Sequence, residues 1–570
     1  MLIKEKYNRT IIFLIVLFCA SIFLIIKDSK ISHESGLYLK PFKLKLENNK
    51  DTIRYTLDGS NPTNKSKLLE KEIYIDPYIN KNYLSYIQTT IPDSIAKFGW
   101  RKPLGEQRKA AVLKYAKFKN NKITSKIKTL TFFIDSNLYK KTYPPTIKNN
   151  ILNTINLKYL NTFIKKDSII TTKYNLPIIS ISTDKENLYG YEKGLFVCGK
   201  EFNPKNKHSG NYFEKGKEFE RKVFFQYFTK NGKLLFEMNI GMRIHGGITR
   251  RNPQKSLMFY AREEYDKNNI DFPFLPNAKI NRFILESMQE SGGGQALIED
   301  IVAQEIVKDL NLETQKFQAT IVFINGEYWG IHNIRERLDE NYLSYKFDLH
   351  KDSFDIINGN PTLGYEPIHG SNLDYLKIID FVKENKLSND SCYNLLSQEL
   401  DIENLINYYS VEIFFANHDW PIHNIKIYRK KSGKWRFLLY DLDAGFTNAR
   451  DHTFNMFERI LNEDKYISPE STFIFRNLMQ NKIFKQKFTS RYKEIIANYM
   501  QPDRTIPIVD SIANIYRENM REHINRWRYP WSIKHHWQKD IDRNIKQFLK
   551  NREAYTLQNL EEFITNDKAQ

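Results

Sequence analysis

The stretch from Ala416 to Phe446 constrains the fold most, because it combines a predicted β-hairpin with a cluster of acids: ANHDWPIHNIKIYRKKSGKWRFLLYDLDAGF. The run IKIYR alternates apolar and polar residues, as a strand with one wet face does. A basic turn follows, and a second apolar run then ends in two carboxylates. Because a hairpin brings its two ends together, Asp419 and Asn424 before the first strand are expected to meet Asp441 and Asp443 after the second.

Three carboxylates in one small space repel one another, and each is costly to remove from water. A bound divalent cation relieves both problems, because hard cations prefer carboxylate and amide oxygens. The spacing also matches known chemistry. Asn424 follows Asp419 by five positions, as in the H-R-D-x-x-x-x-N loop of protein kinases, and Asp443-Ala444-Gly445 is similar to their D-F-G. The constellation favours a metal–phosphate site over its alternative, a capped loop beside a hairpin with solvated acids.

The same stretch resembles the core of the CotH-type kinases, a family named for a spore-coat protein kinase. Three upstream segments carry the resemblance further: LPIISISTDKENLYGYEKGLFVCG (Leu176–Gly199), IGMRIHGGITRRNPQKSLMFYAR (Ile240–Arg262) and TIVFINGEYWGIHNIRERLDENYL (Thr320–Leu343). Together the matches cover roughly residues 170–545, about two-thirds of the chain. The resemblance implies an atypical protein-kinase-like catalytic domain over residues 170–550, within a chain of the α+β class.

This resemblance also implies roles for the acidic cluster. ATP would be the phosphate donor, and Mg²⁺ or Mn²⁺ would hold its phosphates. Asp419 would be the catalytic base that accepts the proton of the acceptor hydroxyl. The implied metal ligands are Asn424, Asp441 and Asp443.

A glycine-containing basic loop is the second implied part of the site. Gly246 and Gly247 open this loop, and glycine lets backbone N–H groups approach a phosphate closely, although an ordinary β-turn is the alternative. The resemblance makes the loop a cover for the nucleotide, with Lys255 as a phosphate contact. Glu336 would orient Lys255 through an ion pair, as in kinases, or would be a surface glutamate between two arginines.

Two hairpins and a helix are predicted between these motifs. Asn231-Gly232 and Asn325-Gly326 each separate two apolar runs and are strong turn signals. Apolar residues recur at helical spacing over Gln295–Leu310 and predict an amphipathic helix. Relatives often carry an arginine in the first turn of this helix, where this chain has Glu299 and Asp300, so a phosphate contact from the helix is in question.

The N-terminal residues 1–28 are typical of a membrane anchor. Lys4, Lys6 and Arg9 precede an apolar run from Ile11 to Ile26. The length of this run suits a signal sequence or a short membrane span, and no clear cleavage site follows it. We expect an uncleaved, single-pass signal anchor in the cell membrane, with its positive end in the cytoplasm and the bulk of the chain extracytoplasmic.

A small all-β sandwich is predicted between the anchor and the large domain, over residues 38–140. FKLKLE and TIRYTL alternate as strands do, and DGSNPT is a dense turn signal. The segments IRYTLDGSNPT and AVLKYAKFKNNKITSK resemble the β-sandwich module at the ends of chitobiase-type enzymes. That resemblance implies a spacer or a carbohydrate-associated domain without catalysis.

The formal net charge of +20 does not by itself indicate a nucleic-acid partner, because the lysines are dispersed along the chain. A positive surface still suits anionic lipid, acidic glycan or phosphate. The expected partners are therefore the membrane, through residues 11–26, a protein substrate that the sequence does not identify, and a cell-surface glycan.

Two classes of function follow from the sequence. In the first, the protein transfers the γ-phosphate of ATP to a Ser or Thr hydroxyl of a protein, with AMP transfer as a variant. In the second, it is a non-catalytic surface protein that holds a divalent metal or a glycan through the same acids, as an outward-facing domain has little ATP around it. A nuclease is a more remote third class.

Overall fold

The computed structural model describes residues 31–45, 52–76, 78–90, 99–134, 175–206, 208–275, 280–288, 294–360, 364–446, 451–461 and 469–566. The predicted anchor at residues 1–28 lies outside these ranges. Among the described residues, no helix is both long enough and apolar enough to span a membrane. The chain divides into two compact units, one from residues 1–82 and 109–139 and the other from residues 83–108 and 140–570.

The smaller unit is all-β, as the alternating strands predict. Its strands are β1 (Gly36–Tyr38), β2 (Phe42–Lys45), β3 (Thr52–Thr56), β4 (Lys67–Leu68), β5 (Glu72–Ile75), β6 (Ala111–Lys119), β7 (Lys122–Ile123) and β8 (Lys128–Ile134). One sheet has the order β1-β8-β6-β3-β4, with β7 paired to β6, and β2 pairs with β5 in a second sheet. Leu44 and Ile73 of the second sheet are buried with Leu113 and Phe132 of the first, so the two sheets share one core.

The segment from 83 to 108, which the sequence prediction counts in the sandwich module, belongs to the larger unit. The backbone N–H of Leu84 and the hydroxyl of Ser85 donate to the buried carboxylate of Glu327. The backbone N–H of Tyr328 donates to the carbonyl of Arg108 at 2.8 Å. A buried carboxylate whose partners lie on this segment holds it firmly, because leaving that charge unpaired is costly.

The first half of the larger unit is a closed β-barrel. Its strands are β9 (Ile178–Ser182), β10 (Arg221–Phe228), β11 (Leu234–Ile244), β12 (Leu257–Tyr260), β13 (Arg282–Ser287), β14 (Phe317–Ile324) and β15 (Glu327–Arg335), in the closed order β10-β11-β12-β13-β15-β14-β9. The antiparallel pairs β10–β11 and β14–β15 confirm both predicted hairpins. At their turns, Gly232, Asn325 and Gly326 have positive φ angles of 77°, 47° and 75°, which these residue types tolerate.

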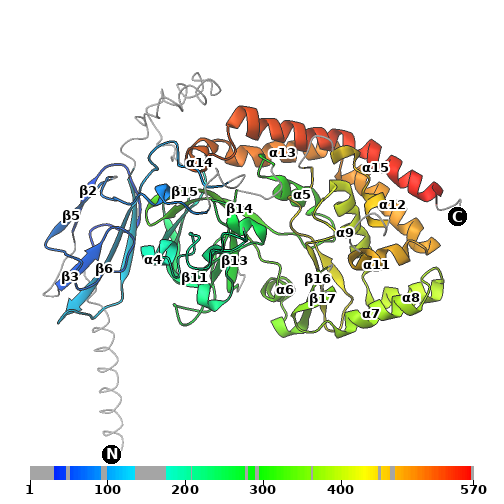
Figure 1. Cartoon of the computed structure of the whole chain (residues 1–570), viewed down its shortest axis with the longest axis horizontal. Helices are drawn as coiled ribbons and strands as arrows, with labels where there is room; N and C mark the ends of the chain where they lie inside the picture. Colours follow the sequence, from blue (N-terminus) through cyan, green and yellow to red (C-terminus); the bar gives the residue numbers. More distant parts are fainter. Residues whose placement is uncertain are drawn as a thin grey trace, which may run out of the picture. The chain divides into compact units, whose positions relative to one another are not determined.

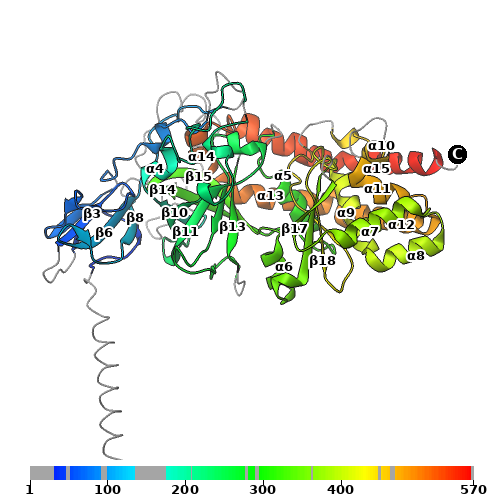
Figure 2. The same ribbon diagram turned by 60° about the horizontal axis from the view of Figure 1, so that its bottom comes forward.

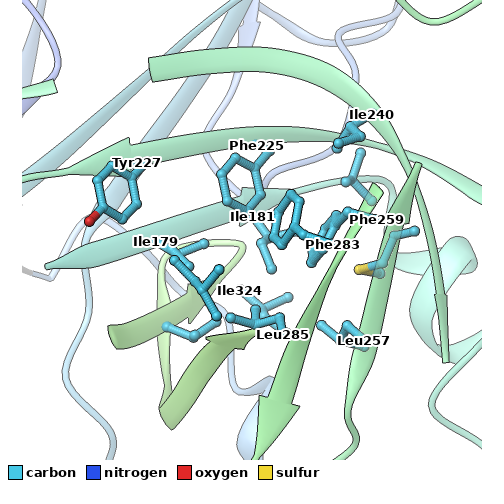
Figure 3. Packing of buried hydrophobic residues seen from close by; sticks show 14 of the residues in the cluster. Ile179, Ile181, Phe225, Tyr227, Ile240, Leu257, Phe259, Phe283, Leu285 and Ile324 are labelled. Carbon is cyan, nitrogen blue, oxygen red and sulfur yellow. The ribbon is translucent and has the colours of Figure 1, made fainter. Parts of the chain in front are cut away.

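Aromatic and aliphatic side chains pack together inside this barrel, as Figure 3 shows. The rings of Phe259 and Phe283 stack with centroids 5.0 Å apart, and Phe225 meets Phe283 edge to face at 5.6 Å. Ile181 and Leu285 are fully buried beside them. Each aromatic pair adds about 0.5–1.5 kcal/mol beyond the area that it buries, so these contacts stabilise the barrel core.

The second half of the larger unit is a small sheet covered by helices. The strands β16 (Phe354–Asn360), β17 (Gly364–His369), β18 (Ile425–Lys430) and β19 (Arg436–Leu438) form a sheet of order β17-β16-β18-β19. The helices of eight or more residues are α5 (Glu299–Val307), α6 (Glu340–Phe347), α7 (Leu373–Glu384), α8 (Asp390–Glu399), α9 (Ile402–Phe415), α11 (Pro469–Leu478), α12 (Lys482–Tyr499), α13 (Pro502–Arg517), α14 (Met520–Trp527) and α15 (Gln547–Asn566). The short helices α4 (Lys185–Tyr189) and α10 (Met456–Leu461) complete the α-helices in the described ranges. Figures 1 and 2 show α13 and α15 running along one side of this unit. The chain therefore combines strands and helices as the predicted α+β class requires.

Helix α9 directly precedes the loop that contains Asp419. The side chain of Asp401 caps its start by accepting from the backbone N–H of Asn404 at 3.1 Å. Every residue from Asn404 to Phe415 is buried, which is typical of a helix in the centre of a domain. The helix ends at Ala416, whose φ of 52° turns the backbone out of the helical path.

Two buried histidines predict acid sensitivity of the larger unit. Burial lowers the pKa of both His332 and His523 to about 3, and the Nδ1 atom of His523 accepts from the N–H of Ile331 at 3.1 Å. An unfolded histidine titrates near pH 6.5, so the unfolded chain binds more protons between pH 6.5 and 3 and stability falls as the pH drops through that window. The two groups together should give a slope of up to about 2.7 kcal/mol per pH unit.

Thermal unfolding of the full chain between pH 7.5 and 4.5 tests this expectation. The variant His523→Gln should show a shallower dependence of the unfolding midpoint on pH. His350→Gln, which replaces a side chain 72% exposed, is the matched control and should follow the wild type. If the unfolding midpoints of the wild type and His523→Gln depended on pH with the same slope, buried His523 would not be a source of the acid sensitivity.

Candidate functional site

A cavity of about 690 Å³ lies between the barrel, α5 and the loops at the ends of the β18–β19 hairpin. The predicted hairpin is confirmed, with Lys426 opposite Leu438 and Tyr428 opposite Arg436. The cavity lining includes six of the eight residues singled out from the sequence: Gly246, Gly247, Asp419, Asn424, Asp441 and Asp443. Lys255 and Glu336 are not part of this lining.

Hydrogen bonds hold the loop before β18 against the loop after β19. The N–H of His418 donates to the carbonyl of Ala444 at 3.2 Å, and the amide of Asn417 donates to the carbonyl of Asp441 at 3.3 Å. Asn424 and Asp441 have positive φ angles of 65° and 62°. Asparagine and aspartate tolerate this region better than most residues, so the sequence is suited to these two sharp turns.

The cavity acids raise one another's pKa. Burial first, and then the nearby charges of Asp300, Glu286 and Asp419, raise the pKa of Asp441 to about 7. Burial and the charge of Asp441 raise the pKa of Asp443 well above its usual range. Such a group of carboxylates gains from a bound cation, which replaces repulsion with attraction.

The donor chemistry fits Mg²⁺ or Mn²⁺, which prefer oxygen ligands. Asn424 supplies an amide oxygen, and Asp441 and Asp443 supply carboxylates that line the cavity. In the described part of the chain, no group of three or more His, Cys, Asp or Glu side chains converges as a metal site of its own. Magnesium at a phosphate commonly takes only one or two protein carboxylates, with phosphate oxygens and water as its other ligands.

The structure does not place Lys255, the predicted phosphate contact, in the cavity lining. Its ammonium group donates to the carbonyls of Arg250 and Asn252 at 2.7 and 3.1 Å and lies 3.9 Å above the ring of Tyr212. The side chain is 1% exposed, and burial holds the pKa of Lys255 well below its usual range. The lysine therefore closes the base of the glycine loop from inside the protein instead of lining the cavity.

The predicted ion pair of Glu336 with Lys255 is also wrong. The carboxylate of Glu336 accepts from the backbone N–H of Lys316 at 2.8 Å and from the hydroxyl of Tyr345. Burial raises the pKa of Glu336. Neither alternative from the sequence describes it, because it is a buried carboxylate that joins the start of β14 to α6.

A different strand-to-helix ion pair stands beside the cavity. The guanidinium of Arg335, at the end of β15, donates to Asp300 in the first turn of α5 at 2.5 Å and to Glu286 on β13 at 3.3 Å. Asp300 and Glu286 both line the cavity. Sequence reasoning missed this group because its members lie on three separate elements. The available signal was Arg335, a charged residue at the end of an apolar strand, together with the unusual acids that open the helix.

The glycine loop forms another wall of the cavity. Gly246 has a φ of 109°, and a Cβ atom on it would lie 2.4 Å from Oγ1 of Thr249. Only glycine fits this position without moving the neighbouring threonine. His245, Gly247 and Thr249 line the cavity beside it, so backbone groups face the space that a ligand would fill.

Comparison with known families agrees with the sequence motifs. Residues 242–556, more than half of the chain, match the family model described as CotH kinase protein. Residues 42–132 match the model described as Fn3 associated, so the closer resemblance of the sandwich to chitobiase-type modules is not confirmed. A comparison with curated proteins finds no match.

Proposed function

Because the chain belongs to the CotH kinase family, we propose that it transfers the γ-phosphate of ATP to a hydroxyl group, with Ser or Thr of a protein as the acceptor. The single observation that supports this best is the cavity, which gathers Asp419, Asn424, Asp441 and Asp443 opposite a glycine loop. Phosphoryl transfer needs little covalent help from a protein and depends on positioning and charge stabilisation. An acid-lined cavity with backbone groups on another wall supplies both.

In the proposed reaction, the acceptor oxygen forms a bond to the γ-phosphorus while the bond from that phosphorus to the β,γ-bridging oxygen breaks. Asp419 accepts the hydroxyl proton, and ADP leaves with the electron pair of the broken bond. Asn424, Asp441 and Asp443 would hold Mg²⁺ or Mn²⁺. The bound metal would neutralise phosphate charge.

The second function class, a non-catalytic surface protein, uses the same acids without a nucleotide. The family membership and the glycine loop both favour the kinase. We further propose that residues 11–26 anchor the chain in the cell membrane with the larger unit outside the cytoplasm, and that the sandwich unit contacts cell-surface glycan. These proposals rest on the sequence of the apolar run and on the resemblance of the sandwich to carbohydrate-associated modules.

Magnesium-dependent stabilisation by ATP tests the proposed function. A ligand that binds only the folded protein raises its stability by about 2.7 kcal/mol at a hundred times its dissociation constant. We expect the unfolding midpoint of the full chain to rise with Mg-ATP or Mn-ATP, and to rise much less with either component alone. A response to Ca²⁺ that nucleotide does not change would support the surface-protein class and contradict the kinase.

A further inference from the structure

The carboxylate of Asp300 joins three parts of the larger unit. Its Oδ1 atom accepts from the backbone N–H of Leu442 at 2.8 Å. Its Oδ2 atom accepts from the guanidinium of Arg335 at 2.5 Å. The side-chain amide of Gln304, one turn along α5, donates to both oxygens at 2.8 and 2.9 Å. Asp300 therefore touches the end of the barrel strand β15, its own helix, and the acidic loop.

The hydrogen bond from Leu442 to Asp300 matters because of where Leu442 lies in the acidic loop. Leu442 lies between Asp441 and Asp443, and its side chain is fully buried. Residues 439–446 belong to no helix or strand, and Asp441 turns the backbone at a φ of 62°. A hydrogen bond at the N–H between the two carboxylates restrains the backbone on either side of them. A charged acceptor makes that bond stronger than a neutral one would.

Arg335 anchors the other side of Asp300. It is 1% exposed and also donates to Oε1 of Gln315 at 3.2 Å. Gln315 in turn accepts at 3.5 Å from Gln304 and donates to the carbonyl of Glu336 at 2.6 Å. A buried hydrogen-bond network thus fixes Asp300. Because Asp300 also bonds to Leu442, it can hold the loop of Asp441 and Asp443 in a fixed position relative to the barrel.

We propose that Asp300 is a positioning residue that ties the loop carrying Asp441 and Asp443 to the barrel through Arg335. This inference rests on the proposed function for the purpose of the loop, because it assigns Asp441 and Asp443 to the metal. Asp300 takes no part in bond making. Its role is to keep two carboxylates, which repel each other, at the positions where a metal-bound triphosphate needs them. Residues that orient metal ligands typically contribute about 10–100-fold in metal affinity or activity.

Hydrogen–deuterium exchange at the Leu442 amide measures the strength of the hydrogen bond from Leu442 to Asp300, and it needs no nucleotide. In the wild type the amide should exchange slowly, and Asp300→Ala should speed its exchange by at least about tenfold if the bond is lost. The control is Asp309→Ala. Asp309 lies just beyond the same helix, its side chain is 63% exposed, and its ion-pair contact with Arg504 is a long 3.6 Å. This control should leave the Leu442 amide unchanged.

Mg-ATP affinity, measured by calorimetry on the same full-length variants, separates positioning from simple stability. Asp300→Ala should weaken Mg-ATP binding by about 10–100-fold, while Asp309→Ala should not. Asp300→Ala removes the closest acceptor of the buried Arg335 and leaves it only the longer contacts with Glu286 and Gln315, so a second variant controls for misfolding. The double variant Asp300→Asn with Arg335→Gln replaces the ion pair by an amide pair, and it should keep Mg-ATP affinity closer to the wild type than Arg335→Gln alone does.

The outcomes separate the two proposals. Unchanged exchange at Leu442 in folded Asp300→Ala overturns the positioning role, and so does faster exchange with unchanged Mg-ATP affinity. If the wild type binds no nucleotide with either metal, the proposed function fails. The exchange result then still decides whether Asp300 holds the loop.

Discussion

Asp443→Ala is expected to abolish metal-dependent nucleotide binding while leaving the fold intact. The carboxylate lies in the cavity wall, where burial and the charge of Asp441 raise its pKa. Removing it takes away a hard oxygen ligand and leaves phosphate charge uncompensated. The loss should reach at least about 100-fold in affinity, since residues that only orient metal ligands already contribute about 10–100-fold.

Titration calorimetry with Mg-ATP measures this loss. Asp352→Ala is a matched control, because Asp352 is an acid in the same unit that is 66% exposed and outside the cavity lining. The control should bind like the wild type. Since Asp443 is destabilised by its neighbours, the alanine variant should also melt at the same temperature as the wild type or higher in the absence of metal. Wild-type affinity in Asp443→Ala would remove this residue from the metal site.

Asp419→Asn is expected to leave Mg-ATP binding within a few-fold of the wild type and to lower the rate of transfer by about 10²–10⁴. Asparagine has nearly the same shape as aspartate but is a poor proton acceptor. The backbone carbonyl of Asp419 accepts from the N–H of His423 at 2.9 Å, and its backbone N–H donates to the side chain of Asn417 at 3.3 Å. Both contacts involve the backbone, so the substitution preserves them.

Single-turnover transfer assays beside binding measurements separate the two roles of the acids. Asp419→Asn should change the rate constant, and Asp443→Ala should change the affinity. Asp352→Asn should change neither. Normal transfer by Asp419→Asn would exclude it as the base, whereas an equal loss of binding in both variants would indicate that Asp419 holds metal.

Local sequence patterns predicted that the four acidic-loop residues of the candidate site lie close together, and the structure places all four in the lining of one cavity. The alternation of IKIYR and the basic turn defined the β18–β19 hairpin, and a hairpin necessarily brings the flanks of its two strands together. The positions of Asp419, Asn424, Asp441 and Asp443 along the cavity follow from that local geometry alone. The hairpins β10–β11 and β14–β15 were predictable for the same reason.

The other half of the site depends on tertiary placement, which local patterns do not contain. Lys255 precedes a strand by only two positions, and its side chain turns inward to backbone carbonyls that the loop itself provides. Glu336 similarly finds a backbone N–H and a tyrosine from neighbouring elements. Arg335 at the end of β15 and Asp300 in the first turn of α5 are far apart in the sequence and meet only in the folded structure. No spacing in the sequence indicates that pairing.

Local sequence patterns also failed to predict which compact unit the segment from 83 to 108 belongs to. Its position between the strands β5 and β6 makes it part of the sandwich by order along the chain. Its buried contacts with Glu327 nevertheless lie in the larger unit. Order along the chain predicts a domain boundary only where a segment packs against its sequence neighbours.

Transfer from ATP labelled at either the α- or the γ-phosphate is the measurement that tests the central proposal most directly. The purified full chain is incubated with Mg²⁺ or Mn²⁺ and a mixture of acceptor proteins, and ADP and protein-bound label are quantified. We predict ADP formation and protein-bound label from γ-labelled ATP, none from α-labelled ATP, and neither product with Asp443→Ala. Protein-bound label from α-labelled ATP would instead identify AMP transfer, and a wild type that forms no ADP and binds no nucleotide with either metal would contradict the assignment as a kinase.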